Sequence, residues 1–428
     1  MVFFGVDKKM LMQLPAVKYL NEKSESEIVK QLYYLHRMKF SFFLLILFLS
    51  QKIFGQDTVK HFWYGRSAGK LPEIGYSLGE DRLGSAKMGY IDTGIILKII
   101  DSADKRYKIQ LSKFHSAYIA KADVARDSVY TEKPFYLTGN YNAIGGTADY
   151  DTLYINGSEK LPYKSWMEIN PSRIIVELYG VQSNTSWITQ NISSLKEIKN
   201  LYYNQAEDDM VCVTIELQNK QHWGYTIRYS GTRLMVLVKR QPPVLNIQKL
   251  KIAVDAGHGG TNTGAAGNTS GIAEKTYTLI FANALQKYLK AKGVKNVIMT
   301  RTTDTTIGNT DRVLWLQKQQ PDLLISLHLN SSDDTSVNGT GTFYKHIGFR
   351  TLSIALLKEM LEAKMNEYGN VGNFNFLLNQ PTDFPNALLE IAFLSNVQDE
   401  KKIRSANFQN LTAAKVYAGI VDFLNQSK

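Results

Sequence analysis

The 428-residue sequence predicts a C-terminal α/β domain, a mostly parallel sheet covered by helices, preceded by one or two small all-β domains. The chain is longer than one ordinary hydrophobic core can fill. It is rich in Tyr (24) and Phe (19), which favours β-structure. After residue 248 strand-length apolar runs alternate with helical stripes, whereas upstream there are only short strand-like runs between turns. We therefore predict β modules at 57–125 and 133–242, and an α/β domain at 248–427.

The first 55 residues contain the pattern of a secretory signal. Met38-Lys39 is followed by the apolar run 40–50, by the small residue Gly55 and then by Gln56. The apolar run is shorter than the roughly 20 residues of a membrane span. We expect translation to begin at Met38 and the mature chain to begin near Gln56, without a transmembrane span after cleavage. An uncleaved anchor is the alternative.

The net charge and the single cysteine limit the partners and covalent links of the chain. The formal charge is +11, and residues 1–55 carry +4 of it, which leaves +7. A moderately basic exported protein suits an anionic surface such as a cell wall or envelope. The sequence lacks a dense Lys/Arg block and a nucleic-acid motif, which argues against nucleic acid as a partner. Cys212 excludes an internal disulfide, and we expect it to be a small buried residue.

Both predicted β modules consist of short strand-like runs separated by turns. The segment 57–125 is typical of a small β-barrel or half-sandwich and loosely resembles bacterial SH3-like modules. The segment 133–242 contains the nearly continuous apolar run 173–179, as in a core strand of a β-sandwich, and ends at the linker Pro242-Pro243. The strand-like runs are 95–100, 107–111, 152–155, 173–179, 211–217 and 233–239.

The α/β domain begins with a buried strand at 251–254 that runs into a Gly-rich turn carrying His258. Further strands are expected at 296–300, 323–329, 340–345 and 387–394, and helices at 274–292, 310–319, 351–368 and 411–424. In such sheets function gathers at the carboxyl ends of the strands.

Chemically active side chains occur at these strand ends. His258, His328 and Glu390 lie there, and Glu274 opens the first helix. Two histidines and a carboxylate are a known ligand set for catalytic zinc, with the fourth position left to water. A further carboxylate is then needed to move the proton. Glu390 lies inside an apolar strand, where a carboxylate is costly unless it is used. The structural alternatives are a buried ion pair for Glu390 and a satisfied core histidine for His328.

Five separated motifs carry a family resemblance. They are DAGHGG at 255–260, Glu274-Lys275 at a helix start, TRTTD at 300–304, DLLISLHLN at 322–330 and PNALLEIAFLSN at 385–396. The segment 248–427 thereby resembles the zinc-dependent N-acetylmuramoyl-L-alanine amidases of the type 3 family. The segment 133–242 resembles the β-sandwich modules that precede the catalytic domain in some cell-wall amidases.

The resemblance implies the roles of four residues and a substrate. It implies that His258, Glu274 and His328 bind Zn²⁺ and that Glu390 is the catalytic acid/base. The implied substrate is the amide joining the lactyl group of muramic acid to L-alanine in peptidoglycan. From this resemblance, together with the signal pattern and the basic charge, we expect an exported monomer in the periplasm or cell envelope. The β modules would hold glycan or an envelope protein partner.

Four further residues are also candidates for a role at the site. Asn330 is expected to orient substrate or a ligand, and Asp255 and Arg301 to support the ligands or the structure. His346 either faces the cleft or lies on the surface.

The sequence departs from the family pattern at two positions. Asn262 stands where the family usually has aspartate, and Leu329 where it often has alanine. Some members carry an inhibitory helix between the second histidine and the catalytic glutamate. Because 331–338 is a short polar loop, we expect an open site without a built-in plug. Two alternatives remain, a non-catalytic cell-wall binding protein and a zinc peptidase or amidase with another substrate.

Overall fold

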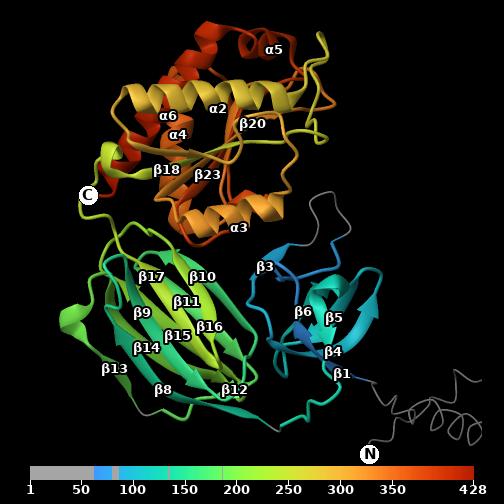
Figure 1. Cartoon of the computed structure of the whole chain (residues 1–428), viewed down its shortest axis with the longest axis vertical. Helices are drawn as coiled ribbons and strands as arrows, with labels where there is room; N and C mark the ends of the chain where they lie inside the picture. The colour runs from blue at the N-terminus through green and yellow to red at the C-terminus, as the bar shows by residue number, and fades with distance from the viewer. Residues whose placement is uncertain (1–61, 80–85, 134, 186) are drawn as a thin grey trace, which may run out of the picture. The chain divides into compact units, whose positions relative to one another are not determined.

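The computed structural model describes residues 62–79, 86–133, 135–185 and 187–428 (Figure 1). The predicted signal segment, with its start at Met38 and its end near Gln56, lies outside the described residues. No helix of the described part is long and apolar enough to cross a membrane. The predicted upstream all-β region and C-terminal α/β region are both confirmed. Their division into separate domains remains a prediction, because residues 62–428 form one compact unit.

The first part of the β region is a seven-stranded antiparallel sheet with the order β3-β2-β6-β5-β4-β1-β7. Its strands are β1 (Trp63–Ser67), β2 (Glu73–Gly75), β3 (Lys87–Tyr90), β4 (Ile96–Ala103), β5 (Arg106–Gln110), β6 (Ser116–Ala120) and β7 (Val124–Arg126). The buried side chains of Ile99, Ile109 and Ile119 form its core.

The second part of the β region consists of two sheets, with the strand orders β10-β11-β15-β14 and β12-β8-β9-β17-β16, and β13 pairs with β8. The strands are β8 (Tyr136–Ile144), β9 (Tyr150–Gly157), β10 (Tyr163–Ile169), β11 (Ser172–Tyr179), β12 (Val181–Gln182), β13 (Ile188–Gln190), β14 (Ile198–Glu207), β15 (Met210–Leu217), β16 (Tyr225–Ser230) and β17 (Arg233–Lys239). On β15 Val211 and Val213 point into the core. Cys212 between them is only partly buried, because neighbouring residues of a strand face opposite ways.

The α/β region contains a six-stranded sheet with the order β19-β18-β20-β23-β21-β22. Its strands are β18 (Lys251–Ala256), β19 (Asn296–Met299), β20 (Leu323–Asn330), β21 (Thr340–Phe343), β22 (Glu367–Val371) and β23 (Asn386–Phe393). β19, β18, β20 and β23 are parallel to their neighbours in this series, whereas β21 runs antiparallel to β23. The sheet is therefore mixed rather than purely parallel.

Helices cover both faces of this sheet (Figure 1). Apolar residues of α2 (Glu274–Ala291), α4 (Arg350–Glu362) and α6 (Ala406–Gln426) share a core with Ile252 and Val254 of β18. On the other face Ala253 packs with Leu316 of α3 (Asn309–Gln319). Successive side chains of β18 point to opposite faces of the sheet, and helices cover both faces. Every position from 252 to 254 is therefore apolar.

Two expected boundaries in the α/β region are wrong. The helix predicted at 351–368 ends at Glu362, and Lys364 then adopts a left-handed backbone conformation (φ 59°) before the edge strand β22. The sequence of β22, EYGNV, has no apolar alternation, because an edge strand need not bury both faces. The last helix starts at Ala406, and a short helix α5 (Val397–Ile403) precedes it, capped by the Asn396 side chain.

Candidate active site

The register of the parallel strands brings the candidate residues to one edge of the sheet. β18 pairs with β20, with Ala256 opposite Leu327, so that the turn after β18 lies beside His328. β20 pairs with β23, with His328 opposite Glu390. Segments more than 60 residues apart therefore contribute side chains to one site.

The three predicted metal ligands converge. His258 Nε2 lies 3.1 Å from Glu274 Oε2, and His328 Nδ1 lies 3.0 Å from Glu274 Oε1. One nitrogen or oxygen of each residue lies within 4.8 Å of the others. Nitrogen and carboxylate ligands bind zinc at about 2.0–2.2 Å, so two ligands of one ion can lie up to about 4.4 Å apart. The donor types and their spacing fit a single Zn²⁺ ion after small adjustments.

The Glu274 carboxylate is held in place by backbone groups. Its side chain is buried, with 4% of the residue exposed. Oε1 accepts a hydrogen bond from the Leu329 amide (3.0 Å) and Oε2 one from the Ala265 amide (2.8 Å). On the far side of His258, Nδ1 lies 2.9 Å from Asn262 Oδ1, which leaves Nε2 directed at the cluster. Asparagine at 262 therefore provides the acceptor oxygen that an aspartate would also provide.

The histidines and carboxylates of the cluster shift one another's pKa. Burial alone would raise the pKa of Glu274, but hydrogen bonds from His258 and His328 outweigh it and hold that pKa far below its usual range. Burial would lower the pKa of His328, but the hydrogen bond to Glu274 and nearby carboxylates raise it. The Glu274 carboxylate thus lies between the two imidazole rings.

Glu390 is a buried carboxylate beside this cluster. It is 6% exposed, and its Oε2 has no hydrogen-bond partner. Within the described residues no lysine or arginine forms an ion pair with it, which argues against the structural alternative of a buried salt bridge. Burial raises its pKa and the Glu274 charge raises it further, although His328 opposes the shift. A buried, underpartnered carboxylate with a raised pKa is typical of a group that exchanges protons.

Two buried arginines hold the turn that carries His258. Arg301 donates to the carbonyls of Ala256 (2.9 Å) and Gly257 (2.9 Å). Arg312 of α3 donates to the Ala256 carbonyl (2.7 Å), to the His258 carbonyl and to Asp255 Oδ1 (2.6 Å). The supporting role expected of Asp255 and Arg301 agrees with these contacts. Sequence reasoning missed Arg312, although a buried arginine was signalled by its place on the apolar stripe with Val313 and Leu316.

Glycines make room for the imidazole and carboxylate groups. A Cβ at Gly257 would lie 2.4 Å from the His328 ring. At Gly264, whose φ is +67°, it would lie 2.4 Å from Glu274 Oε2. The glycines of the turn therefore allow a close approach of the backbone to these groups, and this extends to Gly264.

The remaining candidates lie in different surroundings. Asn330 ends β20, and its Oδ1 accepts from the Ser331 amide (2.8 Å). His346 lies neither in the cluster nor free on the surface, because its Nε2 donates to the Gln380 carbonyl (2.8 Å) beside a different cavity. Phe376, which sequence reasoning did not single out, stacks parallel to His328 with ring centroids 6.4 Å apart. The segment 331–339 contains no helix.

Comparisons with known proteins match the segment that contains these site residues. The sequence model of the N-acetylmuramoyl-L-alanine amidase family matches residues 252–422. The chain is 30% identical over 179 residues to N-acetylmuramoyl-L-alanine amidase LytC of Bacillus subtilis (strain 168), and this match covers 40% of the chain and 35% of LytC. It is 27% identical over 360 residues to N-acetylmuramoyl-L-alanine amidase AmiC of Escherichia coli O6:H1, covering 64% of the chain and 86% of AmiC.

A solved structure is similar to the same part of the chain. The catalytic domain of CwlV, an N-acetylmuramoyl-L-alanine amidase from Bacillus (Paenibacillus) polymyxa var. colistinus, is 30% identical, with a TM-score of 0.39. This match covers 41% of the chain and 98% of the CwlV domain. Residues 252–422 of this chain therefore form a domain of the N-acetylmuramoyl-L-alanine amidase family.

Proposed function

We propose that this protein hydrolyses the amide between the lactyl group of N-acetylmuramic acid and L-alanine in peptidoglycan, with one Zn²⁺ ion as cofactor. The observation that carries the proposal is the convergence of His258, Glu274 and His328, whose ligand atoms lie within 4.8 Å of one another. The family match of residues 252–422 supplies the substrate class.

His258, Glu274 and His328 would hold the metal. A Zn²⁺ ion bound there would polarise the amide carbonyl and lower the pKa of a water molecule towards about 7. Asn262 orients His258, and the Leu329 and Ala265 amides fix the carboxylate, so the ligands need little rearrangement.

Glu390 is the proposed acid/base. It takes a proton from the water that attacks the carbonyl carbon, and it returns a proton to the alanine nitrogen as the carbon–nitrogen bond breaks. Burial keeps its pKa raised, so that a carboxylate can both accept and release a proton near neutral pH. Phe376, beside His328, provides an apolar wall for the methyl groups of the lactyl and alanine parts.

The wider setting of the proposal is the cell envelope. The net charge of +7 expected for a mature chain suits an anionic wall polymer. We propose that the protein is exported, acts as a monomer on peptidoglycan, and uses its β region to contact glycan or an envelope protein. Asn330, at the end of β20, is proposed to orient the substrate.

The proposal is tested by mass spectrometry of purified peptidoglycan digested with the full chain, with and without a chelator. The expected products are an intact glycan strand and free stem peptides that begin with L-alanine. Chelation should stop their release and added Zn²⁺ should restore it. Zinc-independent release would contradict the metal assignment, and cleavage at another bond would favour the zinc peptidase alternative. Binding without cleavage would favour a non-catalytic wall-binding protein.

A further inference from the structure

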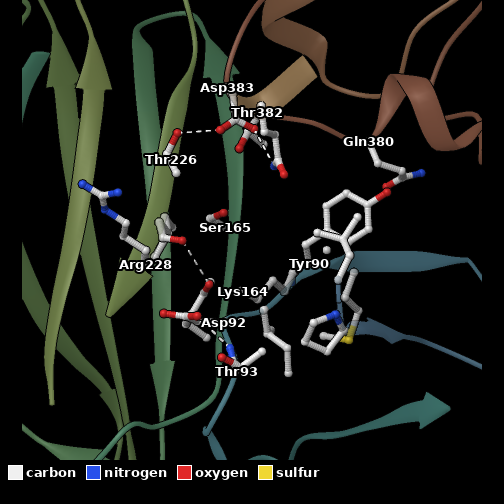
Figure 2. A pocket seen from close by; sticks show the side chains of 18 of the residues that line it. Tyr90, Asp92, Thr93, Lys164, Ser165, Thr226, Arg228, Gln380, Thr382 and Asp383 are labelled. Carbon is white, nitrogen blue, oxygen red and sulfur yellow. Dashed lines mark hydrogen bonds between the residues drawn. The ribbon is translucent and has the colours of Figure 1, made fainter. Parts of the chain in front are cut away.

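A cavity of about 370 Å³ lies apart from the His258 cluster. Its walls come from both parts of the β region, from α3, from His346 and from the segment 380–383 before β23, and Figure 2 shows part of them. None of His258, Glu274, His328 and Glu390 lines it. The proposed hydrolysis therefore leaves this cavity without a role.

Two polar groups in the cavity wall lack a partner. The Tyr90 hydroxyl and the Gln380 amide nitrogen are buried atoms without a hydrogen bond. Gln380 is 5% exposed as a residue. An unpaired buried donor destabilises the folded state, and buried polar groups in folded proteins are almost always paired. These two donors point to a ligand that presents acceptor oxygens.

The wall also offers acceptors. Asp383 accepts from the Thr226 hydroxyl (2.6 Å) and from Gln317 Nε2 (3.1 Å), and Figure 2 shows the Thr226 contact at one end of the cavity. At the other end Asp92 accepts from the amides of Thr93 (2.7 Å) and Tyr229 (2.7 Å). A carboxylate has about four lone-pair sites, so each keeps capacity for a ligand hydroxyl or amide.

The charges of the wall nearly balance. Lys70 forms an ion pair with Asp311 (2.9 Å), and Lys164 lies 3.5 Å from Glu177. The Arg228 guanidinium points away from the other labelled side chains (Figure 2). Burial raises the pKa of Asp383, so a further negative charge beside it would be unfavourable. An apolar ligand would leave Tyr90 and Gln380 unpaired.

We propose that this cavity is a second binding site, for a small neutral saccharide. The hydroxyl groups of a sugar both donate and accept, which matches donors on Tyr90 and Gln380 and acceptors on Asp92 and Asp383. The aromatic rings of Tyr90 and Tyr163 line the same cavity and offer apolar faces to the C–H groups of a sugar ring. The site does not depend on the amide hydrolysis proposed above.

The test is isothermal titration calorimetry of N,N′-diacetylchitobiose into the full chain carrying Glu390→Gln. We expect binding that persists in chelator. Tyr90→Phe removes only one hydroxyl and should weaken binding about two- to tenfold, and Gln380→Met should do the same, as expected for one hydrogen bond each. Tyr118→Phe, at a tyrosine outside the cavity wall, should leave the affinity unchanged.

Three outcomes would overturn the proposal. They are no heat of binding up to the solubility limit of the disaccharide, an affinity unaffected by both cavity variants, and preferential binding of the dipeptide L-Ala–D-Glu. Thermal unfolding of each variant checks that the fold is retained. Because peptidoglycan cleavage and disaccharide binding are measured separately, either proposal can fail without the other.

Discussion

At the scale of single residues, Glu390 departs from the usual burial of charged side chains. Every residue of β23 from Asn386 to Phe393 is buried, and this strand nevertheless includes a carboxylate with a free oxygen. Such a group destabilises the folded state, and proteins keep it mainly where function requires it. In the proposed function Glu390 transfers the proton and the cluster beside it binds the metal.

We predict that Glu390→Gln lowers the rate of stem-peptide release at least 100-fold and leaves one zinc per chain. The amide keeps the size of the side chain but cannot exchange a proton, and general acid–base catalysis contributes about 10²- to 10⁴-fold. Zinc is measured by elemental analysis and release by chromatography. Activity above a hundredth of wild type would refute the role of Glu390.

Arg312 is predicted to be the residue whose loss most destabilises the α/β region. Its guanidinium and the Asp255 carboxylate are 2% and 1% exposed as side chains and lie 2.6 Å apart. Arg312→Met should lower the free energy of unfolding by about 3–5 kcal/mol, because it leaves a buried carboxylate without its cation. Urea unfolding measures the loss, and Arg350→Met, at an exposed arginine, is the control.

A double variant separates the lost ion pair from lost packing. Adding Asp255→Asn to Arg312→Met removes the unpaired charge. Of the two hydroxyls that donate to Asp255, those of Thr300 and Ser326, one can still donate to the amide oxygen and the other can accept from the amide nitrogen. The double variant should therefore be more stable than Arg312→Met alone. Equal stability of the double variant and Arg312→Met would show that the unpaired Asp255 charge does not cause the loss of stability.

At the scale of elements, the turn after β18 places His258 beside the end of β20. His258 itself has a left-handed backbone (φ 62°), which is uncommon for a residue other than glycine. The arginine donors to the carbonyls of 256, 257 and 258 hold this conformation. The turn is thus rigid before any metal binds.

We predict that Gly257→Ala weakens zinc binding about 10- to 100-fold, in the range of changes to groups that orient metal ligands. The added methyl group would lie 2.4 Å from the His328 ring and must displace it. Competition with a fluorescent chelator measures the affinity. Gly146→Ala, where the nearest atom would be 3.4 Å away, is the matched control. Unchanged affinity in Gly257→Ala would argue against His328 as a ligand.

At the scale of the whole described unit, the β region and the α/β region share hydrogen bonds. The Tyr225 amide donates to the Thr382 carbonyl (2.7 Å), and Lys239 Nζ donates to the Pro321 carbonyl (2.7 Å). Gln221 Nε2 donates to the Gly348 carbonyl (2.7 Å), and His222 packs against Gly348. His222 is fully buried, and its Nε2 donates to the Glu168 carbonyl (2.7 Å).

The burial of His222 at this contact predicts that the folded unit 62–428 loses stability in mild acid. Burial lowers the pKa of His222 to about 4, from 6.5 for the ordinary side chain. Above pH 6.5 the histidine is neutral in both states and contributes no pH dependence. Between pH 6.5 and about 4 only the unfolded chain takes up the proton, so stability falls by about 1.4 kcal/mol per pH unit. Below about pH 4 this loss levels off.

Urea unfolding at pH 7.5 and pH 5 tests the prediction. The difference between the two free energies should shrink in His222→Gln, whatever the absolute stability of that variant. A pH dependence identical to that of the wild type would contradict the assignment. His346, whose pKa burial also lowers to about 4, adds a dependence of the same sign that remains in the variant.

The sequence by itself determined the α/β architecture and the residues of the candidate centre. Apolar runs specify the strands, function gathers at their carboxyl ends, and His258 and His328 stand at two such ends. The family resemblance added Glu274, which opens α2 and is held by the amides of Leu329 and Ala265 rather than by strand register.

Only the tertiary structure decided what lies around that centre. Arg312 reaches the turn from a helix 54 positions away, and the edge strand β22 has no apolar pattern of its own. The unpaired Glu390 oxygen and the cavity beside Gln380 likewise depend on contacts between distant segments. Such contacts arise from packing, which a local sequence pattern does not encode.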